Sequence, residues 1–210
     1  MVRGNTLADK LESWSQALFL VAGVLLLVYA VLLGAEAQTG TVYETVGNLV
    51  SGTGGALAFV GLLGLYRRFV QHTPWLTRAG GAAAAVGAVG FAVVAVRAAA
   101  VLFGVVGSSS SNGPTLVFIP ILLGMVLGFA LFALASHRAG PSASGPTLRL
   151  LAPTVVFLVV VAGGLSGVSQ MWVSAVLATA HGLTYLAIGT ALRAEATGET
   201  AVDRAPDSTV

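Results

Sequence analysis

The sequence predicts an all-α integral membrane protein, with six transmembrane helices in a compact bundle and both termini in the cytoplasm. Three observations lead to this prediction. Hydrophobic residues make up 56% of the chain and charged residues only 9%, whereas soluble domains carry about 25% charged residues. The apolar residues form runs of roughly 20, the length that crosses a hydrocarbon layer about 30 Å thick. Nearly all basic residues fall in alternate connections between these runs.

Charges or turn residues bound each expected span. The six spans are about 15–34, 45–66, 80–105, 115–135, 150–168 and 171–192. The last two follow from the stretch between Arg149 and Arg193, which holds no Asp, Glu, Lys or Arg. A turn around "SGVSQ" divides it into two crossings, and one long buried helix is the alternative. A closed β-barrel is disfavoured because its strands alternate apolar and polar residues over about 10 positions.

The connections between the spans predict the orientation. Lys and Arg are retained on the cytoplasmic side of a membrane, and connections that contain them alternate here with connections that contain none. Of the ten basic residues, only Arg97 lies within a span. We therefore expect a transmembrane domain over 1–193 and a disordered polar cytoplasmic tail over 194–210. The nine residues on the cytoplasmic side are Arg3, Lys10, Arg67, Arg68, Arg78, Arg138, Arg149, Arg193 and Arg204.

We expect a multi-pass protein in the plasma membrane of a prokaryote. The preference for Arg over Lys and the richness in Ala, Gly and Val are typical of a GC-rich coding genome. An alternative for the N-terminus is a signal peptide cleaved after Ala37, at "AEA", which would leave five spans. The apolar run from Ala17 is about 18 residues, longer than the 7–15 of a signal peptide, and therefore favours a retained first span.

Small residues predict which helix faces pack together, because helices in lipid associate through close backbone approach. In the third span Gly87, Gly90 and Arg97 share one helical face, so Arg97 is expected to point into the bundle. A lipid-facing position is disfavoured, since an arginine at a helix centre costs about 2.5–3.5 kcal/mol even on the insertion scale. The other rows are Gly124 with Gly128, Gly163 with Gly167, and Ser174 with Ala178 and Gly182.

Polar residues in the second span are the expected partners of Arg97. Glu44, Asn48 and Ser51 lie at i, i+4 and i+7, which is one helical face. Counting 1.5 Å per residue places Asn48 about 5 Å and Arg97 about 10 Å below the outer boundary. An arginine side chain covers that difference, so Glu44 is the expected counter-charge. Further candidate partners are Tyr29 and Glu36.

Two hypotheses for the function follow. The first is an outward-facing polar pocket around Arg97, lined by Glu44, Asn48, Ser51 and His181, that binds or passes a small anionic solute. The second is a non-catalytic membrane subunit or scaffold, whose Arg97–Glu44 and His181 contacts are purely structural and whose function depends on a membrane protein partner. In both, the lipid bilayer is a partner. The net charge of +2 is too small to predict binding to nucleic acid.

The residue inventory predicts no catalytic site, no metal site and no cofactor. The chain has no cysteine, which excludes thiolate chemistry. Lys10, the only lysine, precedes the first span, so a Schiff base has no attachment point within the membrane. The three histidines, at positions 72, 137 and 181, show no paired spacing of metal ligands.

Two short motifs in the last two expected spans bear on this conclusion. "GLSG" at 164–167 and "AHG" at 180–182 resemble the serine and histidine motifs of rhomboid intramembrane proteases, which would imply Ser166 as nucleophile and His181 as base. In rhomboids a further helix separates the serine helix from the histidine helix, whereas here the two spans are consecutive. A nucleophile must also lie within about 3 Å of its base. We therefore do not predict a protease.

Overall fold

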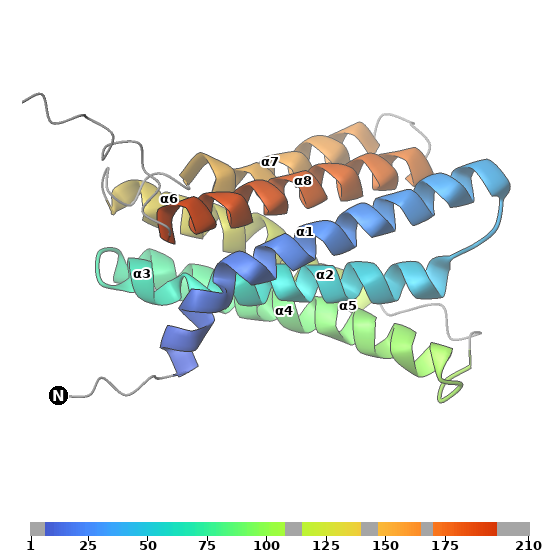
Figure 1. The fold of residues 1–210 in the computed structure, drawn as a ribbon, viewed down its shortest axis with the longest axis horizontal. Helices are drawn as coiled ribbons and strands as arrows, with labels where there is room; N and C mark the ends of the chain where they lie inside the picture. Colours follow the sequence, from blue (N-terminus) through green and yellow to red (C-terminus); the bar gives the residue numbers. More distant parts are fainter. Residues whose placement is uncertain (1–6, 108–114, 140–146, 165–169, 197–210) are drawn as a thin grey trace, which may run out of the picture.

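The computed structural model describes residues 7–107, 115–139, 147–164 and 170–196, and this part of the chain is helical with short connections. Figure 1 shows the helices lying side by side along the long axis of the molecule. The elements are α1 (Leu7–Thr39), α2 (Glu44–Gly64), α3 (Tyr66–Val70), α4 (Pro74–Leu102), α5 (Thr115–Leu123), the π-helix η2 (Gly124–Gly128), α6 (Phe129–Arg138), α7 (Thr147–Gly164) and α8 (Gln170–Ala196).

The helices form a closed ring in sequence order. The short α3 continues α2 beyond Leu65, and α5, η2 and α6 follow one another without a break. Each helix, or unbroken series of helices, packs against the next one along the chain, and α1 packs against α8, which closes the ring. Consecutive antiparallel packing is what short connections between long apolar helices favour.

Five of these helices or helix series are long and apolar enough to cross a membrane. They are Leu11–Thr39, Glu44–Val70, Pro74–Leu102, Val117–Arg138 and Trp172–Glu195. The sixth expected span, about 150–168, falls on α7, whose described apolar stretch Arg149–Val159 is shorter than a crossing. The all-helical, multi-pass prediction is thus supported for five spans, and the sixth span stays a prediction.

The boundaries differ from the expected ones at several helix ends, and two of these differences bear on the termini. Helix α1 begins at Leu7 and ends at Thr39, so it includes the "AEA" sequence at 35–37, and retention of the first span stays a prediction. Helix α8 continues through Ala196, so the first three residues of the expected tail, 194–196, are helical. The rest of that tail lies outside the described residues, as does Arg204.

An aromatic cluster fills the centre of the ring. We give this name to Phe19, Phe59, Phe129 and Tyr185, each at most 1% exposed. The ring centroids of Phe59 and Phe129 lie 5.4 Å apart, those of Phe129 and Tyr185 lie 5.7 Å apart, and those of Phe19 and Tyr185 lie 6.1 Å apart. The cluster therefore joins α1, α2, α6 and α8 directly, and such ring pairs stabilise a core beyond their buried area.

Glycines bring the helix backbones into contact around this cluster. A Cβ added at Gly87 of α4 would lie 2.9 Å from Gly124 Cα, and one added at Gly52 of α2 would lie 2.7 Å from the Ala95 nitrogen. A Cβ at Gly182 of α8 would lie 3.0 Å from the Gly23 carbonyl oxygen. The predicted inward face of Gly124, Gly128, Ala178 and Gly182 is confirmed, since all four are buried. Ser174, the third residue of the α8 row, is half-buried. Gly167 lies outside the described residues, and the inward facing of Gly163 stays a prediction.

Charges lie at the two ends of the bundle. One end, which we call the basic end, is where α3 and α6 end and α4 and α7 begin, and it carries the basic side chains that the structure describes apart from Arg97. Glu36 and Glu44 lie at the opposite end, beside the connection between α1 and α2. Trp14, near the basic end, is 66% exposed, and Trp172, near the opposite end, is 54% exposed. Exposed tryptophans at both ends are typical of membrane interfaces.

Candidate functional site

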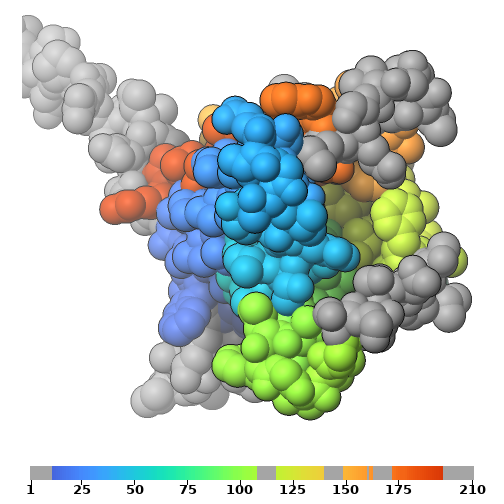
Figure 2. All heavy atoms as spheres, turned by 90° about the vertical axis from the view of Figure 1, so that its right-hand side faces the viewer, coloured from blue at the N-terminus to red at the C-terminus, as the bar shows by residue number. Residues whose placement is uncertain are grey.

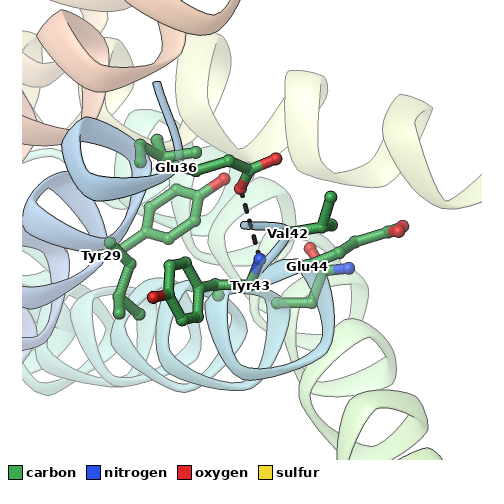
Figure 3. A pocket seen from close by; sticks show the side chains of 9 residues that line it. Tyr29, Glu36, Val42, Tyr43 and Glu44 are labelled. Carbon is green, nitrogen blue, oxygen red and sulfur yellow. Dashed lines mark hydrogen bonds between the residues drawn. The ribbon is translucent and has the colours of Figure 1, made fainter. Parts of the chain in front are cut away.

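A small pocket lies between α1 and α2 at the end opposite the basic residues, and we call it the hairpin pocket (Figure 3). Its volume is about 200 Å³. Figure 2 looks onto this end, where the α1–α2 connection covers the middle of the face and the end of α4 lies below it. The lining residues are Tyr29, Leu32, Leu33, Glu36, Val42, Tyr43, Glu44, Gly47 and Asn48.

The turn between α1 and α2 shapes this pocket. Gly40 takes a positive φ of 69°, a conformation that glycine adopts without steric cost, and its N–H donates to the Glu36 carbonyl oxygen at 2.9 Å. The Tyr43 N–H lies 3.5 Å from Glu36 Oε2. In Figure 3 the Tyr29 hydroxyl lies near the Glu36 carboxylate, while Glu44 points away from it. Glu36 therefore holds the start of α2 against the end of α1.

The lining of the hairpin pocket carries negative charge. Glu36 and Glu44 are its two charged residues, and Tyr29, Tyr43 and Asn48 supply the other polar side chains. Glu44 and Asn48 were predicted from the sequence to share one helical face, and Tyr29 and Glu36 were further candidates. All four line the pocket. Arg97, Ser51 and His181 are not among its lining residues.

Arg97 lies on α4, five residues before the helix ends, and is half-buried. Helix α4 meets α2 through Ala95, against Gly52, and meets α5 through Gly90, against Pro120 and Ile121. At about 100° per residue, Arg97 is rotated by about 200° from Ala95 but only by about 20° from Gly90. Its helical face is therefore the one that Gly90 turns toward α5. The pairing of Arg97 with Glu44 stays a prediction.

His181 occupies a different region, in the buried middle of α8. The residue is 4% exposed. Its Nδ1 lies 2.9 Å from the Leu177 carbonyl oxygen and its Nε2 lies 3.1 Å from the Pro153 carbonyl oxygen of α7. The imidazole also meets the rings of Phe157 and Tyr185 edge-on. His181 thus connects α7 to α8 through backbone acceptors, a role within the bundle that needs no ligand.

A second buried polar contact joins α7 to the π-helix. Thr154 Oγ1 donates to the Met125 carbonyl oxygen at 3.1 Å, and Tyr185 Oη donates to Met125 Sδ at 3.6 Å. A π-helix shifts the hydrogen-bond ladder from i→i+4 to i→i+5 and often occurs at functional sites. The sequence analysis missed Thr154 and Met125, because no spacing pattern marks a π-helix within "GMVLG". Pro153, beside Thr154, lies inside α7, and a proline within a helix was the one local signal in this segment.

The described residues contain little that performs chemistry. No group of three or more His, Asp or Glu side chains among them is placed to hold a metal ion. Ser166, the serine of the rhomboid-like sequence, lies outside the described residues. Each ring nitrogen of His181, its companion in that sequence, lies within 3.1 Å of a backbone carbonyl oxygen, and the tautomer decides to which of the two the neutral imidazole donates.

The fold and its long apolar helices define the class as an all-helical protein compatible with multi-pass insertion in a membrane. The comparisons add no narrower identity: no family model, curated protein or solved structure matches this chain.

Proposed function

We propose that this chain is a non-catalytic membrane subunit, a six-span bundle with cytoplasmic termini in a prokaryotic plasma membrane, which acts through contact with a partner membrane protein. The aromatic cluster carries this proposal, because fully buried rings occupy the centre of the helix ring where a solute would have to pass. The positive-inside distribution of Arg and Lys supports the orientation.

The polar groups of the interior support the same reading. His181 and Thr154 are both buried, and both use backbone carbonyl groups of neighbouring helices as partners. Buried polar groups in a membrane bundle contribute to helix association when they are satisfied internally. Their roles in this proposal are those of structural contacts.

A second candidate is solute binding at the end of the bundle away from the basic residues. The hairpin pocket favours it, since the pocket unites Glu44 and Asn48 with Tyr29 and Glu36. In this candidate the helical face of Arg97 is turned toward α5 and not toward the pocket. The two carboxylates of the lining, Glu36 and Glu44, repel an anion. A small anion, the solute expected from the sequence, would therefore bind in this pocket only if the Arg97 side chain turned toward α2.

Cysteine accessibility tests whether the middle of the bundle is closed, since the natural chain has no cysteine. Asn48→Cys reports on the hairpin pocket, Ala58→Cys and Thr154→Cys report on the buried middle, and Gln38→Cys is an exposed control at the same end. In intact cells, an impermeant maleimide should label positions 38 and 48 only. A small permeant thiol reagent should also leave positions 58 and 154 unmodified in the folded protein. Labelling at both of these positions would reveal a water-filled path and refute the closed subunit.

The partner is tested separately. The chain, extracted from its own membrane in a mild detergent, should elute with a second membrane protein in fixed stoichiometry that survives repurification at low concentration. A lone chain with labelled middle positions would favour the solute-binding candidate.

A further inference from the structure

A larger pocket lies at the basic end of the bundle, and we call it the basic-end pocket. Its volume is about 570 Å³, and it is bordered by α1, α2 with α3, and α8. Leu65 and Leu192, at most 8% exposed, form its apolar part. Charged and polar side chains form the remainder, among them Glu12, Gln16, Arg68 and Glu195. The lining is therefore amphipathic, apolar on one part and charged on the other.

The pocket lies where two neighbouring helices separate. Helices α1 and α8 pack together along the bundle, but Figure 1 shows the N-terminal turns of α1 and the C-terminal turns of α8 diverging at this end, with α2 and α3 behind them. Trp14, on the same turns of α1, is 66% exposed. An exposed tryptophan at the end of an apolar span marks the level of lipid headgroups. The opening between α1 and α8 is thus at headgroup depth.

The charged groups of this pocket have both signs. Arg68 Nη1 donates to Glu195 Oε2 at 2.7 Å, with side chains 27% and 29% exposed. A guanidinium carries five N–H donors in a planar fork, so Arg68 retains the capacity to contact a phosphate beside Glu195. Glu12 adds a second, exposed carboxylate to the lining. A ligand complementary to this lining carries a phosphate and a cationic donor together.

Gln16 supplies an independent observation. Its Oε1 is buried without a hydrogen-bond partner, a situation that is uncommon in native structures and requires an explanation. Gln16 belongs to the pocket lining, so its side chain borders the space that a ligand would fill. The group that would satisfy it is a hydrogen-bond donor. An N–H group on a ligand in the pocket would supply such a donor.

We propose that the basic-end pocket binds the headgroup of a zwitterionic phospholipid with a primary ammonium group, of the phosphoethanolamine type. Arg68 contacts the phosphodiester, while Glu12, Glu195 and the Gln16 amide oxygen accept hydrogen bonds from the ammonium group. Leu65 and Leu192 contact the glycerol and upper acyl region. An anionic headgroup meets two carboxylates with only one cation, and a choline headgroup has no N–H to donate. This inference needs only a membrane-embedded bundle and does not depend on the proposed subunit function.

The test uses the full-length protein in nanodiscs of phosphatidylcholine doped with lipids whose ammonium carries zero, one, two or three methyl groups. Thermal stability and retained lipid, measured by native mass spectrometry, should fall along this series as donors are lost. We expect about tenfold stronger retention of the primary ammonium lipid than of the choline lipid, since charge-assisted hydrogen bonds distinguish them. Phosphatidylglycerol should be retained no better than the choline lipid.

Two variants and a control assign the effect to this pocket. Glu12→Gln, at an exposed position that the fold tolerates, should flatten the methylation series. Arg68→Ala should reduce retention of every phospholipid, whereas Arg67→Ala, which removes the neighbouring exposed charge outside the lining, should leave the series unchanged. Equal retention of all four lipids by the wild type, or an equal effect of Arg67→Ala and Arg68→Ala, would overturn the proposal. Displacement by millimolar glycerophosphoethanolamine would overturn the lipid as the source of the headgroup.

Discussion

Polar groups have different partners in the buried middle of the bundle and at its hairpin end. In the middle, His181 and Thr154 are at most 4% exposed and are held by backbone carbonyl groups of Pro153 and Met125. At the hairpin end, Glu36 and Glu44 line a pocket open at the surface, and Arg97 is only half-buried. Depth accounts for the difference, because water satisfies polar groups near the ends of a membrane bundle and only protein does so at the centre.

This comparison separates structural polar groups from candidate ligand groups. A polar side chain whose partners are backbone atoms of neighbouring helices contributes to helix association and leaves little for a ligand. A carboxylate that lines a surface pocket keeps acceptor capacity for other partners. Variants in these two regions, and one at the exposed basic end, should differ in effect, and the largest effect is expected in the middle.

A close backbone contact of the middle region should tolerate no side chain. Gly87→Ala places a Cβ 2.8 Å from Phe59 Cζ and 2.9 Å from Gly124 Cα, and overpacking of this kind costs about 1–3 kcal/mol. We expect a clear loss of folded yield and a lower midpoint of thermal unfolding in detergent. Gly34→Ala is the matched control, because a Cβ there meets nothing within 4 Å. Equal effects of the two variants would contradict the close α4–η2 packing.

Loss of the His181 contact should be the next largest effect. His181→Ala removes the ring that connects α8 to Pro153 of α7 and leaves a void beside Phe157, for an expected cost of about 1–3 kcal/mol. Steric trapping or chemical denaturation in mixed micelles measures it. Thr179→Ala, on the exposed side of the same helix, serves as control and should change stability by less than about 0.5 kcal/mol. A wild-type stability for His181→Ala would show that the contact contributes nothing.

The sequence-predicted pair of the hairpin end should give a smaller effect. If Arg97 contacts Glu44, the double variant Arg97→Glu with Glu44→Arg recovers folded yield that each single variant loses, with a coupling energy of about 0.5–1 kcal/mol. A double-variant cycle on unfolding midpoints measures the coupling. Additive losses would instead assign Arg97 to the α5 side, the direction that Gly90 faces.

The smallest effect belongs to the ion pair at the basic end. Glu195→Gln removes the charge opposite Arg68, and both side chains are more than a quarter exposed, so the loss should stay below about 1 kcal/mol. The effect should shrink further at high salt, because exposed charges are screened. Unfolding midpoints at low and high ionic strength measure both. A loss as large as that of His181→Ala would mean that solvent screens this pair far less than its exposure indicates.

Much of the helical architecture could be predicted from local properties of the sequence. Five of the predicted spans coincide with helices of suitable length and composition. The small-residue rows around Gly124 and Gly182 are buried as their spacing predicted, and the i, i+4 relation of Glu44 and Asn48 placed both in the hairpin pocket. These features depend on residues close together in the chain, where helix geometry alone relates them.

The direction of Arg97 was not accessible in the same way. The periodicity of α4 predicted a shared face for Arg97, Gly87 and Gly90, but it did not tell which neighbouring helix that face meets. Gly90 meets α5, whereas Ala95, on another face of the same helix, meets α2. A helix in a ring has two neighbours, and a pattern within one helix does not distinguish them.

By itself the sequence determined the helical, membrane-compatible class, the approximate ends of the long helices and the separation of charge between the two ends of the bundle. Only the tertiary structure decided that α1 closes the ring against α8, that His181 meets Pro153, and that Met125 presents its carbonyl group to Thr154. The physical reason is range. Hydropathy and helical period act over a few turns of one chain segment, whereas these contacts join residues 28, 29 or more positions apart, and only the packing of all the helices brings them together.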